Sequence, residues 1–215
     1  MPDKPERKSA VATRRGDDGT TGLLFGGQRI FKDDQRTEAF GAVDEAIAAL
    51  GLARAELGMK AQYGTSPRAL DRLPDLILRL QRELFVVGAE LATAPGAVDR
   101  QRPGETRVTA EMVEGLDALL ADSEAAVELP REFVVPGETR LSASLELART
   151  IIRRAERRAV ALRRSEPIAD DRLVPYLNRL ADLLWILARA AEQSESRTPT
   201  PSRTATRSSA GATEP

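Results

Sequence analysis

The 215-residue chain contains no cysteine and no histidine, and aromatic residues make up only 4% of it. The absence of cysteine excludes disulfides, thiolate nucleophiles and zinc fingers, and the absence of histidine excludes imidazole acid–base catalysis. Any chemistry must therefore use carboxylates, guanidinium groups, lysine, hydroxyls, backbone amides or the reactants themselves. This favours a protein that positions reactive substrates over one that supplies a nucleophile.

The chain also lacks a large excess of either charge, because 32 basic and 33 acidic residues give a formal net charge of −1. A general nucleic-acid-binding protein would usually carry a strong positive excess, so we expect no nucleic-acid partner and only a small anionic ligand. No apolar run approaches the roughly 20 residues that a membrane-spanning helix needs. Residues 1–12 lack the apolar core of a signal peptide, so we expect a cytoplasmic protein without a membrane partner.

What the chain has in abundance is alanine, leucine and arginine, a composition that favours helices over strands. Apolar residues recur at three-, four- and seven-residue steps, and no strong strand pattern is present. The periodicity predicts an all-α helical bundle with helices over residues 34–57, 67–93, 109–122, 141–164 and 171–192. We expect one domain over residues 13–193, a flexible N-terminus over 1–12 and a disordered, Ser/Thr/Pro-rich tail over 194–215.

Several residues refine these boundaries. Thr109 is expected to cap the third helix, and Pro74 indicates that the second helix starts later than residue 67 or is kinked. The polar stretch Pro95–Val108 contains glycine and proline and is predicted to be an exposed loop. Residues 133–137 are predicted to be extended, because Pro136 disfavours helix in the residue before it.

A stretch rich in glycine and threonine precedes the first expected helix, and we call residues 13–33 the Gly/Thr segment. Its glycines let backbone N–H groups turn toward one point and form an anion-binding concavity. Its threonine hydroxyls add donors, and Arg14, Arg15 and Lys32 add positive charge. The segment is therefore predicted to hold a polyphosphate, although it lacks the Gly-Lys-Ser/Thr ending of a P-loop.

The fourth expected helix contains seven arginines between Arg149 and Arg164. Helical spacing places four charged residues on one side, which we call the arginine face: Arg149, Arg153, Glu156 and Arg157. One interpretation is a solvated helix face on which Glu156 makes ordinary ion pairs. The other is an anion site, since the planar guanidinium group suits phosphate oxygens.

Three single residues also have two interpretations each. Asp44 borders the apolar side of the first helix, and it either reaches solvent or pairs with Arg149, within the chain or across a subunit boundary. Asn178 lies in the middle of the fifth helix, as a surface residue or as a functional one. Phe133 precedes the arginine-rich helix, and it either fills the core beneath its loop or shapes a ligand pocket.

Together these features resemble one known family. The motifs that carry the resemblance are, in chain order, Thr13-x-x-Gly16-Asp17-x-Gly19-x-Thr21, Lys32-Asp33-Asp34, Ala39-Phe40-Gly41-x-Val43-Asp44-Glu45, Phe133-Val134-Val135-Pro136-Gly137, Ala148-Arg149-Thr150, Arg153-Arg154-Ala155-Glu156-Arg157-Arg158 and Tyr176-Leu177-Asn178-Arg179-Leu180-x-Asp182. Their order and spacing are similar to those of PduO-type ATP:cob(I)alamin adenosyltransferases, over residues 13–192. The resemblance implies a five-helix bundle of the ferritin-like, cobalamin adenosyltransferase-like kind, assembled as a homotrimer.

The resemblance also implies an activity. The reduced cobalt of cob(I)alamin would attack the 5′ carbon of ATP, which gives adenosylcobalamin and triphosphate. Because the cobalt is the nucleophile, no activated side chain is needed. ATP, Mg²⁺ bound mainly through ATP, and cobalamin as a substrate would be the ligands, with a cob(II)alamin reductase and an adenosylcobalamin-dependent acceptor enzyme as partners.

Individual residues receive roles from the same resemblance. Arg153 would be catalytic, neutralising charge on the leaving triphosphate. Phe133 would be catalytic as well, lying under the corrin and helping to displace its lower axial ligand. Asp44 and Arg149 would form an intersubunit salt bridge. The residues implied to bind ATP are Thr13, Arg14, Arg15, Gly16, Thr20, Thr21, Lys32, Arg153, Arg154, Glu156, Arg157 and Asn178.

The chain departs from the family pattern at three positions in the Gly/Thr segment. Arg14 and Arg15 stand where family members usually have lysine and threonine, and Phe25 stands where a small residue is common. The change at Arg14 keeps the charge. Two other functions stay open on the sequence. One is an escort that binds adenosylcobalamin with little turnover, and the other is a non-catalytic helical module whose arginines contact RNA or an acidic protein.

Overall fold

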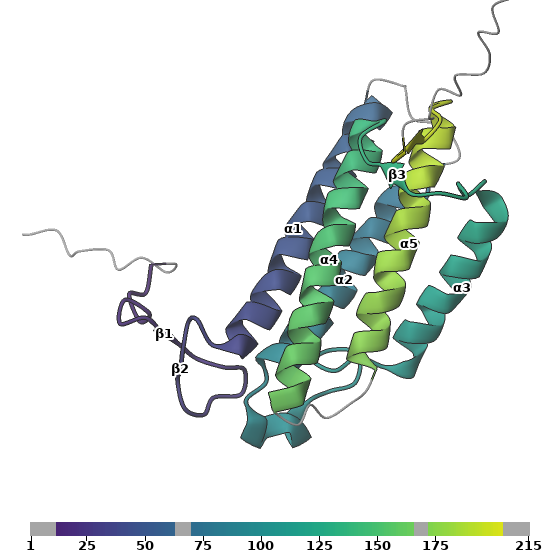
Figure 1. The fold of residues 1–215 in the computed structure, drawn as a ribbon. Coiled ribbons are helices and arrows are strands. Elements are labelled where there is room, and N and C mark those ends of the chain that lie inside the picture. Colours follow the sequence, from purple (N-terminus) through teal and green to yellow (C-terminus); the bar gives the residue numbers. More distant parts are fainter. Residues whose placement is uncertain (1–11, 63–69, 166–171, 204–215) are drawn as a thin grey trace, which may run out of the picture.

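The computed structural model describes residues 12–62, 70–165 and 172–203, which form five α-helices, one 3-10 helix and four strands of two residues each. The α-helices lie side by side along one direction (Figure 1). Their bounds are Gln35–Gln62 for α1, Leu73–Ala92 for α2, Ala110–Ala126 for α3, Arg140–Ser165 for α4 and Leu173–Ser194 for α5. The prediction of a mainly helical protein is confirmed, and each predicted helix is present.

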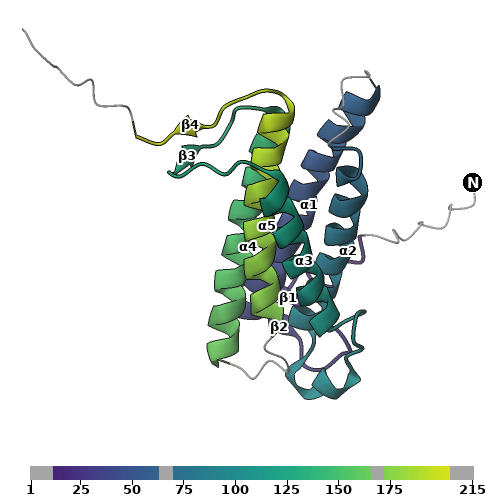
Figure 2. The same cartoon turned by 90° about the vertical axis from the view of Figure 1, so that its right-hand side faces the viewer.

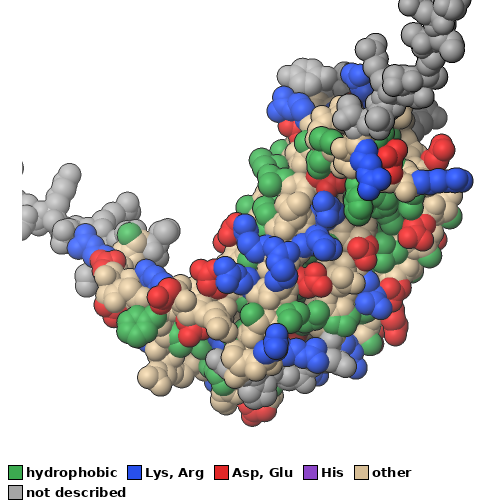
Figure 3. Space-filling view, in the orientation of Figure 1, with side chains coloured by type: hydrophobic (Ala, Val, Ile, Leu, Met, Phe, Trp, Pro, Cys, Tyr) green, Lys and Arg blue, Asp and Glu red, His purple; other side chains and the backbone are tan. Residues whose placement is uncertain are grey.

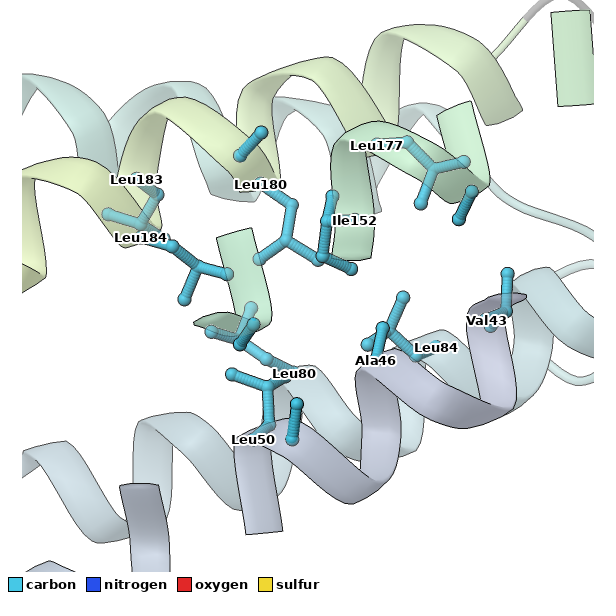
Figure 4. Packing of buried hydrophobic residues seen from close by; sticks show 14 of the residues in the cluster. Val43, Ala46, Leu50, Leu80, Leu84, Ile152, Leu177, Leu180, Leu183 and Leu184 are labelled. Atoms are coloured by element: carbon cyan, nitrogen blue, oxygen red, sulfur yellow. The ribbon is translucent and has the colours of Figure 1, made fainter. Parts of the chain in front are cut away.

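The core runs the length of the helices and consists mainly of leucine, alanine and branched aliphatic residues. Helix α1 packs on α2 and α4, and α5 packs on α4 and α3. Figure 4 shows apolar side chains from four helices meeting in the interior, among them Val43, Ala46, Leu50, Leu80, Leu84, Ile152, Leu177, Leu180, Leu183 and Leu184. Burying a side chain such as leucine contributes about 1.5–3 kcal/mol, so this shared core holds the helices in fixed positions.

The helix starts follow local hydrogen bonding. Oγ1 of Thr109 accepts a hydrogen bond from the backbone N–H of Met112 (3.3 Å), which confirms the predicted cap of α3. Helix α4 has an equivalent start that the sequence analysis missed, because the backbone N–H of Ser142 donates to Oγ1 of Thr139 at 3.0 Å and the backbone N–H of Thr139 donates to Oγ of Ser142 at 3.2 Å. Helix α2 begins at Leu73, so Pro74 lies in its first turn, where its missing N–H costs no helical bond. Residues 67–69 lie outside the described residues.

The predicted exposed loop over Pro95–Val108 is wrong in part. Its first half forms the 3-10 helix η2 (Pro95–Arg100). Val108 at its other end is fully buried. The backbone N–H of Val108 donates to Oε2 of the buried Glu90 at 2.6 Å, which ties the stretch to α2.

The strands form two small antiparallel pairs. Strands β1 (Thr20–Thr21) and β2 (Ile30–Phe31) pair within the Gly/Thr segment, and β3 (Val134–Val135) pairs with β4 (Thr200–Pro201). The extended stretch predicted before α4 is confirmed as β3. In contrast, the prediction of a disordered tail is wrong for residues 194–203, which form the end of α5, a turn and β4.

The remaining part of that tail, residues 204–215, and residues 1–11 of the predicted flexible N-terminus lie outside the described residues. No helix in the described part of the chain combines the length and apolarity required to cross a membrane.

Candidate active site

A pocket of about 940 Å³ opens beside the first half of α4. It lies between α3, α4, α5 and the stretch that leads into β3. Apolar and charged side chains share its wall, including Phe133, Arg149, Arg153, Asp182 and Trp185. Such a mixture suits a ligand that has both a flat apolar part and an anionic part.

Phe133 lies at this pocket with 88% of its surface exposed, so the interpretation of a core residue is wrong. Its carbonyl oxygen accepts a hydrogen bond from the backbone N–H of Ser202 at 2.8 Å, next to the β3–β4 pair. The backbone on either side of the ring is thus held by a strand that follows α5. This placement agrees with the other interpretation, in which Phe133 shapes a ligand pocket.

The arginine face lies along α4, and basic side chains gather over this helix in the middle of the surface in Figure 3. Glu156 makes no ion pair in the described part of the chain. Its Oε1 instead accepts a hydrogen bond from Nδ2 of Asn178 at 3.4 Å, which brings the two predicted residues together. Arg153 and Arg157 are exposed and have no acidic partner among residues 12–62, 70–165 and 172–203. This pattern favours an anion site over a face neutralised by its own ion pairs.

Other arginines of α4 do form ion pairs with α1. Arg154, which is among the predicted ATP-binding residues, pairs with Glu45. Arg158 lies 3.3 Å from Glu38, measured from Nη2 to Oε2. These two contacts connect α4 to α1 on the side next to the arginine face. On the arginine face itself, Arg153 and Arg157 are the arginines that have no acidic partner within the described residues.

Asp44 and Arg149 do not pair with each other within the chain. Asp44 is exposed on α1 and has no ion-pair partner in the described ranges. Nε of Arg149 donates to Oε2 of Glu146 at 2.6 Å, one turn earlier on α4. A pairing across a subunit boundary therefore stays a prediction.

The Gly/Thr segment is held by hydrogen bonds among its own residues. Nζ of Lys32 donates to the carbonyl oxygen of Gly16 at 2.8 Å. Arg29 donates from Nε to Oγ1 of Thr20 at 2.7 Å and from Nη2 to the carbonyl oxygen of Arg15 at 2.7 Å. Two of the predicted phosphate-binding side chains, Lys32 and Thr20, are thus engaged in internal bonds.

Asp18 adds a further internal contact. Its Oδ1 accepts hydrogen bonds from the backbone N–H (3.0 Å) and the hydroxyl (2.8 Å) of Thr20, and these bonds lower the pKa of the Asp18 carboxyl. The side chains of four predicted residues make no hydrogen bond or ion pair within the described residues, namely Thr13, Arg14, Arg15 and Thr21. Arg14 has a φ of 57°, a left-handed conformation unusual for a residue with a side chain.

The Gly/Thr segment and the arginine face do not meet in the single chain. Figure 1 shows the β1–β2 pair projecting beside the start of α1, and Figures 1 and 2 show β3 toward the opposite end of the helices. The pocket is lined by residues next to β3 and by the first half of α4. In Figure 3 the surface is hollowed between the projecting segment and the basic surface of α4. The structure thus brings Phe133, Arg149 and Arg153 to one pocket, with Glu156 and Asn178 on the neighbouring turns.

Sequence reasoning missed several residues that shape the site. Arg29 organises the Gly/Thr segment, Trp185 lines the pocket, and Glu146 contacts Arg149. The spacing of three residues between Glu146 and Arg149 on a helix was a usable signal for their ion pair. Nothing in the local sequence indicates that Ser202 would contact Phe133, because that contact joins segments 69 residues apart in the chain.

The fold and the pocket define a class of protein: a mainly helical protein whose pocket presents an exposed aromatic ring and, within the described residues, a guanidinium group that has no acidic partner. Comparison with known proteins makes this specific. The family model for cobalamin adenosyltransferase matches residues 11–191. This chain therefore belongs to the cobalamin adenosyltransferase family, and it is a transferase.

Individual relatives agree with this assignment. The chain is 40% identical over 184 residues to a corrinoid adenosyltransferase of Citrobacter freundii, covering 85% of this chain and 94% of the relative. It is 37% identical to a corrinoid adenosyltransferase of Bacillus subtilis, covering 82% of this chain and 83% of the relative.

Solved structures agree as well. A variant of the PduO-type ATP:corrinoid adenosyltransferase from Lactobacillus reuteri, complexed with cobalamin and ATP, superimposes with a TM-score of 0.77 at 28% identity, over 90% of this chain and 99% of the other. The resemblance inferred from the motifs is confirmed.

Proposed function

We propose that this chain transfers the 5′-deoxyadenosyl group of ATP to the cobalt of cob(I)alamin, releasing triphosphate. The observation that carries the proposal is the shared pocket of Phe133 and Arg153 in a member of this family. An exposed aromatic ring offers a surface on which a flat macrocycle can lie. An unpaired guanidinium group beside it can meet charge that develops on phosphate oxygens.

In the proposed reaction the cobalt electron pair forms the new bond to C5′ of ATP, and the bond from C5′ to the triphosphate oxygen breaks. The negative charge of that bond pair passes to the triphosphate. Arg153, which has no acidic partner in the described part of the chain, would stabilise this charge without first having to break an ion pair. Phe133 would exclude water from the lower face of the corrin and displace its lower axial ligand.

The nucleotide site is proposed to be assembled from two chains. Within the described residues, no hydrogen bond or ion pair joins the Gly/Thr segment to Arg153, Glu156, Arg157 or Asn178. The β1–β2 pair instead projects beside the start of α1 (Figure 1), so the segment of a neighbouring copy would complete the site. Thr13, Arg14, Arg15, Gly16, Thr20, Thr21 and Lys32 would then hold the triphosphate and ribose, and Arg154 would support the arginine face from its outer side. The proposed assembly is a homotrimer of five-helix bundles, joined in part by Asp44 of one copy and Arg149 of the next.

Mg²⁺ would enter this site with the nucleotide. The residues present fit that mode of binding, because Glu156 supplies a half-buried carboxylate that makes no ion pair within the described residues. Mg²⁺ is commonly held by one or two carboxylates together with substrate phosphates. Bound there, the ion would offset phosphate charge. The proposal also includes a cytoplasmic location, a cob(II)alamin reductase as electron source and an adenosylcobalamin-dependent enzyme as product acceptor.

One assay tests the activity. The protein is mixed with ATP, Mg²⁺, a corrinoid and a reductant, and the visible spectrum is followed for the cobalt–carbon bond while triphosphate is quantified. We expect multiple turnovers with one triphosphate released for each adenosylated corrinoid. Tight binding of adenosylcobalamin without turnover would instead identify an escort. Failure to bind either substrate, together with retention of RNA, would identify an interaction module.

A further inference from the structure

Four charged side chains form a continuous series from the core of the helices to the wall of the pocket. In order from the interior they are Glu192 and Arg189 of α5, and Glu146 and Arg149 of α4. The first three are buried, with Arg189 and Glu192 at 0% exposure of the side chain and Glu146 at 4%. Arg149 is 24% exposed and lines the pocket together with Glu146.

Glu146 is the bridging group in this series. Its Oε1 lies 3.2 Å from Nη2 of Arg189, and its Oε2 accepts a hydrogen bond of 2.6 Å from Nε of Arg149. On its far side, the same Nη2 atom of Arg189 lies 2.8 Å from Oε1 of Glu192. Each oxygen of Glu146 thus has a different arginine, one in the core and one in the pocket wall.

Burial explains why this arrangement is fixed. A guanidinium group without access to water needs carboxylate partners, because an unpaired buried charge is strongly destabilising. Arg189 cannot turn toward solvent, and it therefore keeps Glu146 in place. Glu146 in turn holds the Arg149 side chain, which would otherwise sample many rotamers on α4.

We propose that Glu146 is a positioning residue that fixes the Arg149 guanidinium in the pocket wall, so that the pocket is preorganised for the corrinoid. This inference rests on the proposed function, since it assigns the corrinoid to the pocket that contains Phe133. The physical basis is that a group ordered before binding need not be ordered by the ligand, which raises affinity. A role confined to stability would act differently, because it would lower the fraction of active protein without changing its affinity.

The chain provides a matched pair of variants for this test. Glu146→Gln and Glu192→Gln each remove one buried carboxylate from an ion pair with Arg189, and each leaves Arg189 with the other. Only Glu146 also touches Arg149. Burial raises the pKa of the Glu192 carboxyl and the Arg189 charge opposes that rise. After Glu192→Gln, Arg189 still has Glu146 as its ion-pair partner, and Arg149 keeps its contact with Glu146.

Two measurements are needed. Steady-state kinetics with varied corrinoid gives KM and kcat separately, and a binding titration gives a Kd that does not depend on turnover. Trp185 is the only tryptophan in the chain and lines the pocket, so quenching of its fluorescence by cob(II)alamin reports binding directly. We expect Glu146→Gln to raise both KM and the quenching Kd about tenfold with kcat within about threefold, as for loss of one ordered contact to a ligand. Glu192→Gln should keep both constants within about twofold of the wild type.

The outcomes separate this inference from the proposed function. A wild-type protein that neither turns over nor binds cob(II)alamin overturns the proposed function and this inference with it. An active wild-type protein whose two variants show equal KM and equal Kd overturns the inference alone. If Glu146→Gln does not fold, Glu146→Asp keeps the buried charge but withdraws it by one methylene. It should raise KM by a smaller factor, and an unchanged KM there also overturns the inference.

A double variant gives an independent check. Because Arg149 is also the proposed partner of Asp44 in the next copy, both proteins are measured at a concentration at which a sizing column shows the same assembly. If Glu146 acts through Arg149, adding Glu146→Gln to Arg149→Met should then change KM no further than Arg149→Met alone, because the group being positioned is already missing. Additive effects of the two substitutions would contradict the assignment.

Discussion

The Gly/Thr segment and the pocket differ in what holds their charged groups. In the segment, exposed cations such as Lys32 and Arg29 bond to the backbone and hydroxyls of the segment itself. In the pocket, Arg149 is fixed through Glu146 to Arg189 in the core. The segment can exchange internal bonds for bonds to a ligand, whereas the pocket keeps its geometry. Residues of the first kind should affect substrate binding, and pocket residues that meet transition-state charge should affect turnover.

The largest effect is expected from Arg153→Ala, which removes from the pocket a guanidinium group that has no acidic partner within the described residues. Loss of one preorganised group that meets transition-state charge typically lowers turnover by about a hundredfold or more. We expect kcat to fall by this factor with little change in the KM for ATP, as measured by the spectral assay. The melting temperature should stay near that of the wild type, since the side chain is exposed and has no ion pair to lose within the described ranges.

Arg158→Ala is the matched control, because it removes an arginine one turn along the same helix that pairs with Glu38 instead of lining the pocket. Its kcat should be close to that of the wild type. Equal losses in the two variants would mean that the positive charge of α4 acts as a whole and that Arg153 has no specific role.

The next largest effect is expected from Lys32→Ala in the Gly/Thr segment. A hydrogen bond to a charged group contributes about 1.5–3 kcal/mol, so the KM for ATP should rise at least about tenfold. The value of kcat should change little, because the lost contact would be the same in the bound substrate and in the transition state. Steady-state kinetics at saturating corrinoid measures both constants.

Arg102→Ala serves as its control, since Arg102 is an exposed cation in an ordinary surface pair with Glu105. If Lys32→Ala lowers kcat and leaves KM unchanged, the segment is not the flexible partner that its internal hydrogen bonds indicate. The contrast with the pocket would then be wrong.

Much of the helical fold could be predicted from the sequence. The periodicity of apolar residues predicted all five α-helices, because one continuous core with helical spacing leaves a strong pattern in each. The helix boundaries differ from the prediction where local residues determine them. Helix α4 starts earlier, after the hydrogen bonds between Thr139 and Ser142, and α2 starts later, at Leu73, with Pro74 in its first turn. Capping residues and prolines of this kind are visible in the sequence, although alternative helix starts lie close together along the chain.

The parts that the sequence did not indicate depend on contacts between distant segments. Strand β4 has no strand-like composition, since it is a Thr-Pro pair in a polar stretch, and it exists because β3 offers an open edge. Glu146 and Arg189 lie 43 residues apart, and only the packing of α4 against α5 makes them partners. The candidate site residues were found as motifs, but the motifs alone do not indicate that the Gly/Thr segment projects beside the start of α1.

A smaller effect is expected from Asp44→Asn, which tests whether a second copy joins the two regions. If Asp44 pairs with Arg149 of a neighbouring chain, loss of a partly exposed ion pair should cost up to about 1 kcal/mol, or roughly fivefold in the association constant. The assembled fraction on a sizing column and the activity should both decline at low protein concentration and recover at high concentration. The comparable substitution Asp122→Asn on α3 should leave the elution volume unchanged. This pairing would be excluded if the assembly and activity of Asp44→Asn depended on protein concentration in the same way as those of the wild type.

The smallest effect concerns the core that supports the pocket. The buried hydroxyl of Tyr176 in α5 donates a hydrogen bond to Oε2 of Glu83 at 2.8 Å. Burial is the main cause that raises the pKa of Tyr176 well above 10, and the negative charge of Glu83 is the second. Above pH 10 the unfolded chain therefore releases a proton that the native protein keeps, so the free energy of unfolding should fall by up to about 1.4 kcal/mol for each pH unit. Tyr176→Phe should lose about 1 kcal/mol at pH 7 with the hydrogen bond, yet show a shallower decline above pH 10. Denaturant titrations of both proteins from pH 7 to 11 measure this difference, and parallel curves would show that Tyr176 is not protected in the core as its burial indicates.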